Sequence, residues 1–393
     1  MSVIRIKIEP KVIIDAVLKS NRDMEEVKER YRNFDKWINK ELDPTFNQLN
    51  ELSRFLRVPF GYLLLETPVT EEIPLLQFRT VDTDAIQKPS RELIDTIHDM
   101  ERKQAWLRDI YNSEGRGKLD FVGSLRFDKD KDQFLIAERI RAIMGLEKNW
   151  YEKANSRLST FQLLRTRLSE NGIMIMQNGI ALNNTHRPLN INEFRAFTLI
   201  DEFAPLIFIN SLDTQNGKAF SLLHELVHIF FGRDSLYNDD LTFRNKYTNP
   251  LEIICNKVSG ELIAPMDVFV TYWEKDYRHL GQSEKIAVIA DEFRVSKIVI
   301  ARKALDKRFI NRHKYMEVVD IVRKEFELSR RKEKNTGGGN AINNALSRID
   351  RNFLRTLINS VQSGNIQHTE AYRLAGVGRG VFEEMMTRLK GVR

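Results

Sequence analysis

Apolar residues recur at helical spacing along most of the chain. In the first 70 residues they predict short helices over 10–19, 24–31, 35–40, 45–56 and 60–65. Thr45 precedes one of these runs and Gln48 follows three residues later, which is the capping-box pattern of a helix start. Longer helical patterns follow over 91–111, 132–144 and 159–171. The N-terminal half is therefore predicted to be mainly helical.

Three later stretches lack a helical period. Residues 74–80 (PLLQFRT) open on a proline and are expected to be extended, and residues 172–179 and 194–210 are apolar, strand-like and bounded by turn residues. The last stretch leads into AFSLLHELVHIFFG at 219–232, a helix that is apolar on most sides and ends at Gly232. We expect a cleft between this helix and the sheet, where an extended substrate can add to the sheet edge.

The helix at 219–232 carries a possible metal site. His224 and His228 lie one turn apart on the same face, with Glu225 beside His224. Two imidazoles at this spacing can hold one Zn²⁺, and the adjacent carboxylate is then free to act on water. Burying these polar groups in an apolar helix is costly unless a metal or hydrogen bonds in the core compensate them. The H-E-x-x-H pattern predicts the metal, and satisfied core histidines are the alternative.

Zinc in a catalytic site needs a third protein ligand. The downstream candidates are Asp239, Asp240, Glu252, Glu261 and His279. Asn249-Pro250 can start a helix that places Glu252 and Asn256 on one face, and we select Glu252. Its alternative role is an ordinary helix-start carboxylate. Asn256 either orients Glu252 or faces solvent.

The segments HELVHIFFG and EIICNKVSGELIAP together resemble the ImmA/IrrE family of metallopeptidases. The family signature is H-E-x-x-H followed by a helix of the form E-x-x-A/C-N-x-F-A-x-x-L-x-x-P. The resemblance implies that His224, His228 and Glu252 are the metal ligands and that Glu225 is the catalytic residue. Val258-Ser259 depart from the usual Phe-Ala but leave these positions intact.

The first 70 residues resemble the phage-repressor (Xre) type of helix-turn-helix domain, most clearly over KWINKELDPTFNQLNELSRFLRVPFGYLLLETP. In that family a helix near residues 34–40 would face the major groove of DNA. The segment before Trp37 is shorter than the family pattern, and Glu41-Leu42 stand where a turn glycine is common. Sequence-specific DNA binding and protein docking are both open for this domain.

The end of the chain contains two more helical modules. Residues 283–306 again resemble a helix-turn-helix, with Ser296 as a helix cap, and either support the core or contact DNA. RRKEKNTGGGNA at 330–341 is typical of a flexible linker. We expect a helix-turn-helix domain at 1–70, a helical connector at 71–155, a zincin-like metallopeptidase domain at 156–310, a helix and linker at 311–340 and a basic helical module at 341–393.

The amino-acid composition indicates the cellular location and limits the possible partners. The single cysteine, Cys255, rules out an internal disulfide and a cysteine-rich zinc site, and favours a reducing, cytoplasmic location. The chain has no signal-peptide pattern or membrane-spanning run. A net charge of +7 permits a nucleic-acid partner without demanding one, because 55 acidic residues are interspersed with 62 basic ones.

These observations predict a mostly helical α+β protein with a small sheet packed on the H-E-x-x-H helix. We expect a zinc-dependent endopeptidase with Glu225 as general base, and Tyr237, Arg244 and Tyr247 as candidate oxyanion donors. The resemblance implies a protein substrate, often a helix-turn-helix repressor or an antitoxin of a mobile element, such as a prophage, or of a stress response. The alternative is a non-enzymatic regulator that binds DNA or protein on the same scaffold.

Overall fold

A computed structural model describes residues 4–20, 22–69, 89–237, 249–275, 280–333 and 340–390. The chain divides into two compact units, Met1–Pro74 with Ala85–Ile97, and Leu75–Asp84 with His98–Arg393. The stretch at 74–80, which we expect to be extended, lies outside the described residues. None of the described helices has the length and apolar character needed to cross a membrane.

The first unit is a small cluster of helices around an apolar core. The capping box predicted at its fourth helix is confirmed, since the side chains of Thr45 and Gln48 each accept from the other's backbone N–H. Phe34 and Trp37, in the helix that the Xre resemblance places in the major groove, are both buried. The elements are α1 (Pro10–Lys19), α2 (Met24–Arg30), α3 (Phe34–Ile38), α4 (Phe46–Leu56) and the 3₁₀ turn η1 (Phe60–Leu64).

The second unit is built on a four-stranded mixed sheet with strand order β1-β3-β2-β4. β1 runs parallel to β3, and β2 is antiparallel to both of its neighbours. The apolar stretch at 194–210 forms two strands because Asp201 turns the chain, accepting from the backbone N–H groups of Phe203 and Ala204. The strands are β1 (Met174–Asn178), β2 (Ala196–Leu199), β3 (Leu206–Asn210) and β4 (Ser235–Tyr237).

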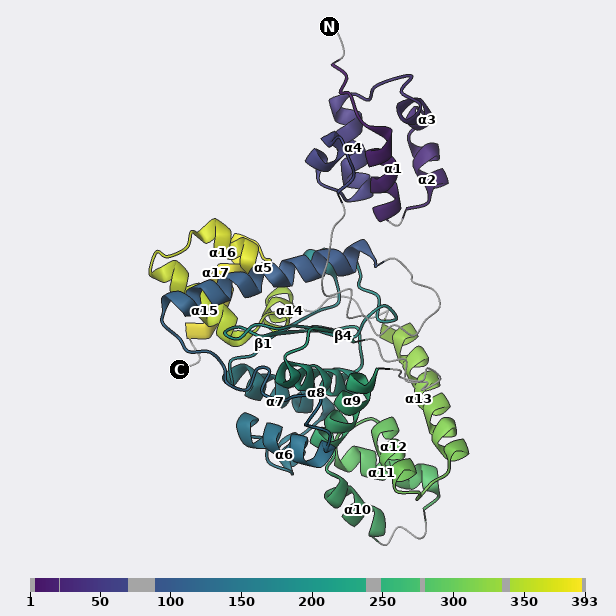
Figure 1. Cartoon of the computed structure of the whole chain (residues 1–393), viewed down its shortest axis with the longest axis vertical. Coiled ribbons are helices and arrows are strands. Elements are labelled where there is room, and N and C mark those ends of the chain that lie inside the picture. The colour runs from purple at the N-terminus through teal and green to yellow at the C-terminus, as the bar shows by residue number, and fades with distance from the viewer. Residues whose placement is uncertain are drawn as a thin grey trace. The chain divides into compact units, whose positions relative to one another are not determined.

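Helices cover both faces of this sheet, with α7 and α8 on one face and α5 on the other (Figure 1). α5 is tied down by Gln104, which donates to the backbone oxygens of Leu199 and Ala204. The helical elements up to the linker are α5 (Arg91–Ser113), α6 (Gln133–Met144), η3 (Trp150–Lys153), α7 (Arg157–Glu170), η4 (Ala181–Asn183), α8 (Gln215–Phe231), α9 (Pro250–Ile263), α10 (Met266–Glu274), α11 (Gln282–Glu292), α12 (Lys297–Asp306) and α13 (Arg312–Glu333).

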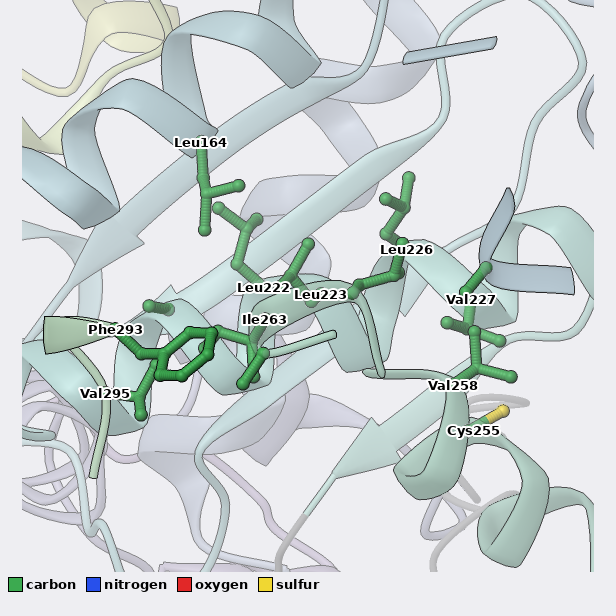
Figure 2. Close-up of a cluster of buried hydrophobic side chains, with 14 of the residues drawn as sticks. Leu164, Leu222, Leu223, Leu226, Val227, Cys255, Val258, Ile263, Phe293 and Val295 are labelled. Atoms are coloured by element: carbon green, nitrogen blue, oxygen red, sulfur yellow. The ribbon is translucent and has the colours of Figure 1, made fainter. Parts of the chain in front are cut away.

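The H-E-x-x-H helix α8 lies at the centre of the core. Its apolar side chains pack against α7, α9 and the turn after α11 (Figure 2). The helix ends at Gly232, whose φ of 64° favours glycine, and a Cβ there would lie 2.9 Å from the Cα of Gly123. This close approach of two backbone segments fixes the end of α8.

The segment that resembles a second helix-turn-helix, α11 with α12, belongs to the same core. Ile286, Ile289 and Phe293 are fully buried, and the Ser296 side chain caps α12 as predicted. These contacts favour core support, because the apolar faces of both helices are used inside the unit.

The C-terminal module docks beside edge strand β1. Arg165 of α7 donates to the backbone oxygens of Ser347 and Ile349, and Asp350 accepts from the backbone N–H of Ile175 at 3.3 Å. Its helices are α14 (Ala341–Arg348), α15 (Arg351–Gln362), α16 (His368–Ala375) and α17 (Arg379–Lys390). The mostly helical α+β fold, with a small sheet packed against the metal-motif helix, is confirmed.

Candidate metal centre

Helices α8 and α9 bring three potential ligands together. Nε2 of His224 lies 3.1 Å from Nε2 of His228 and 3.1 Å from Oε2 of Glu252. Nε2 of His228 lies 3.3 Å from Oε1 of Glu252. All three side chains are buried, and their ligand atoms lie within 4.8 Å of one another.

These distances fit a tetrahedral ion. Zinc bound to nitrogen and carboxylate oxygen at about 2.0–2.1 Å holds its ligand atoms about 3.3–3.5 Å apart. The observed separations of 3.1–3.3 Å are close to that value. Two imidazoles and one carboxylate are also the ligand set of many catalytic zinc sites, which leaves a fourth position for water.

Charge is balanced within this cluster. Burial alone would raise the pKa of Glu252, but the neighbouring imidazoles of His224 and His228 lower it well below the usual range of a carboxyl. Burial would likewise lower the pKa of His228, but the adjacent Cys255 thiol and the Glu252 carboxylate raise it well above its ordinary value. The buried Glu252 carboxylate therefore stays deprotonated, which is the form in which a carboxylate binds a metal.

Glu225 lies next to the cluster with one oxygen occupied and one free. Oε2 accepts from the hydroxyl of Thr198 on β2. Oε1 is buried and has no hydrogen-bond partner among the described residues. Burial raises the pKa of Glu225, although both neighbouring histidines and the Thr198 hydroxyl act to lower it. An unpaired carboxylate oxygen of raised basicity is suited to accept a proton.

Asn256 and Tyr237 hold His224 in place. Nδ1 of His224 lies 3.1 Å from Oδ1 of Asn256, so this nitrogen carries the proton and Nε2 keeps its lone pair for a metal. The ring of Tyr237 packs on the His224 ring, with centroids 4.0 Å apart. The sequence suggested that Asn256 orients Glu252. In the structure the side chain of Asn256 contacts His224 instead of Glu252. Asn256 lies one turn after Glu252 on α9, at a position next to α8.

The other candidate ligands do not join the cluster or lie outside the described residues. Both carboxylate oxygens of Glu261 accept from the backbone N–H of Met266, and Oε2 also pairs with Lys303 at 3.1 Å. The candidates outside the described residues are Asp239, Asp240 and His279, together with the proposed oxyanion donors Arg244 and Tyr247. Thr198 was missed from the sequence, although it is a lone hydroxyl within the apolar strand AFTL.

The fold and the buried ligand cluster together define a zincin-like, metallopeptidase-like domain. Residues 168–305 match the profile of the IrrE N-terminal-like domain, which supports the resemblance of this part of the sequence to the ImmA/IrrE family. Residues 349–388 match a domain of unknown function. No curated protein and no solved structure matches the chain.

Proposed function

We propose that this protein is a zinc-dependent endopeptidase that cleaves a protein substrate. The observation that carries the proposal is the convergence of His224, His228 and Glu252 next to the unpaired Oε1 of Glu225. If the cluster only stabilised the fold, we would expect the buried Oε1 of Glu225 to have a hydrogen-bond partner, because leaving a buried polar atom unpaired costs free energy.

Zinc bound by the three ligands would supply a Lewis acid that lowers the pKa of water and polarises the scissile carbonyl. Glu225 would take a proton through Oε1 and later deliver it to the leaving amine. Thr198 would hold Oε2 of Glu225 so that Oε1 stays directed at the reacting groups. Asn256 would keep the proton of His224 on Nδ1.

The substrate we propose is a helix-turn-helix repressor or an antitoxin. Support comes from the match of residues 168–305 to the IrrE N-terminal-like domain and from the helical first unit, whose resemblance to a helix-turn-helix domain suits recognition of a similarly folded partner. The alternative of a DNA-binding regulator finds less support in the first unit. Its residues 1–69 contain twelve basic and eleven acidic side chains, and a domain that binds nucleic acid usually carries a clear basic excess.

Metal content provides the first test. Protein purified without chelator should contain about one zinc per chain by elemental analysis, and Glu252→Ala should lose it, because a site with two ligands binds zinc much more weakly. A wild-type protein that takes up no metal after zinc addition and dialysis would refute the peptidase proposal.

Glu225→Gln then separates an enzyme from a regulator. The amide cannot accept the proton, so cleavage of the substrate should stop while zinc stays bound. A biological effect that survives this substitution would instead identify a non-enzymatic scaffold.

A further inference from the structure

A cavity of about 510 Å³ adjoins the ligand cluster inside the second unit. Tyr237 and Asn256, which both contact His224, also line this cavity. Ser221, one turn before His224 on α8, lies in the same wall. The cavity therefore begins at the immediate neighbours of the proposed metal site.

The cavity is mostly apolar and larger than one side chain. A cavity of about 150 Å³ holds a benzene molecule, so this one has room for about three groups of that size. Its volume also falls within the range of small-molecule and peptide pockets. The apolar side chains around it come from α9, α12 and α13, and they include Ile253, Ile298, Val299, Met316, Val322 and Phe326.

The charged side chains at the cavity leave a positive excess. Lys257 and Arg312 are exposed and form no ion pair with any described residue. The remaining cations of the lining already have acidic partners, in the pairs Arg195–Asp213 at 2.7 Å, Arg302–Asp306 at 3.0 Å and Lys303–Glu261 at 3.1 Å. Two cations beside an apolar cavity favour a ligand that combines apolar groups with acidic ones.

We propose that this cavity selects the substrate by taking two or three apolar side chains of a protein segment that also carries acidic residues close to them. The selection concerns the substrate of the proposed peptidase, but the binding step itself needs no metal. Val299 and Met316 are specificity-determining residues in this proposal, since they are apolar side chains that line the cavity and are not among the proposed metal ligands.

Gly260 offers a way to fill the cavity without disturbing the fold. It lies inside α9 and lines the cavity, and a Cβ at this position would meet no atom within 4 Å. A leucine there extends into the empty volume, whereas an alanine adds a single methyl group. Both substitutions replace a glycine in a helix interior by a better helix former, so both variants should fold.

The test measures binding of fluorescein-labelled peptides by anisotropy, with the Glu225→Gln protein so that no peptide is cleaved. The probe has leucine and phenylalanine side chains between two glutamates. In one matched peptide serine replaces the apolar residues, and in another lysine replaces the glutamates. Gly260→Leu, Gly260→Ala and Lys257→Glu are each combined with Glu225→Gln, and all proteins are measured with zinc and after chelation.

We expect Gly260→Leu to raise the Kd for the acidic apolar probe at least tenfold, and Gly260→Ala to change it less than twofold. The serine peptide should bind at least tenfold more weakly than the probe. The lysine peptide should also bind more weakly to the parent protein and gain affinity with Lys257→Glu, since the repulsion is removed.

Equal binding of the probe and the serine peptide, an unchanged Kd in Gly260→Leu, or no binding at millimolar concentration would each overturn the inference. These outcomes are distinct from a failure of the peptidase proposal. A protein that binds no zinc would still bind the probe, and a zinc-loaded protein without peptide selectivity would leave the proposed catalytic centre standing.

Discussion

Replacing Thr198 by valine should shift the pH dependence of cleavage. The Thr198 hydroxyl donates to Oε2 of Glu225, and both side chains are fully buried. A hydrogen bond to the carboxylate stabilises its charged form and so lowers the pKa of Glu225 against the effect of burial. Valine has nearly the shape of threonine but no donor. The pKa of Glu225 should therefore rise in the variant.

The magnitude follows from the energy of the lost hydrogen bond. Hydrogen bonds to charged groups contribute about 1.5–3 kcal/mol, and one pKa unit corresponds to about 1.4 kcal/mol. The pKa of Glu225 should therefore rise by about one to two units. Because Glu225 must be deprotonated to accept a proton, the acidic limb of the kcat/KM profile should move to higher pH by the same amount.

The assay is the pH profile of kcat/KM for wild type, Thr198→Val and Thr198→Ser, with zinc content measured for each protein. Serine keeps the hydroxyl and should leave the acidic limb within a few tenths of a pH unit of wild type. A ¹³C NMR titration of labelled glutamate gives a second reading of the same pKa. An acidic limb that stays in place in Thr198→Val, with zinc bound and Glu225 essential, would refute the assignment of Glu225 as the titrating base.

Three further predictions concern stability. Free zinc at one hundred times its Kd should stabilise the wild type by about 2.7 kcal/mol, seen as a higher Tm, and should not shift the Tm of Glu252→Ala. Lys303→Met should lower the free energy of unfolding in urea by about 3–5 kcal/mol, because it strands the buried Glu261 carboxylate, and adding Glu261→Gln should recover part of the loss. Arg165→Ala removes hydrogen bonds to the C-terminal module and should weaken its docking by about 1–3 kcal/mol, so that limited proteolysis of the module accelerates. The exposed Arg167→Ala is its control; equal proteolysis of the two variants would contradict this docking contact.

The sequence predicted those parts of the site that depend on local geometry. The spacing of His224 and His228 is one helical turn, so any helix over these residues places them on one face. Glu252 could be selected because Asn249-Pro250 starts its helix, and the Asn249 side chain does accept from the backbone N–H of Leu251. Periodicity and capping alone determine these features.

Other features of the fold and of the site depend on packing between segments that are distant along the chain. The strand-like stretch at 194–210 is divided into two strands by a turn at Asp201, and the buried residues on both sides of that turn gave no alternation of polar and apolar positions by which two strands could be recognised. Thr198 acquires its role only because β2 lies beside α8, 27 residues further along the chain. The partner of Asn256 depends on the rotation of α9 against α8, which neither helix specifies by itself.

The distribution of charge bears on which partner the molecule binds. Residues 1–69 carry a net charge of +1, so six of the seven net positive charges of the chain lie in the other residues. In the C-terminal module Arg373, Arg379 and Arg388 each pair with a glutamate on their own helix, which leaves less charge for phosphate contacts. At the cavity beside the ligand cluster, Lys257 and Arg312 have no such partner among the described residues. Unpaired positive charge thus lies at the cavity beside the proposed catalytic centre, where it can attract an acidic protein segment.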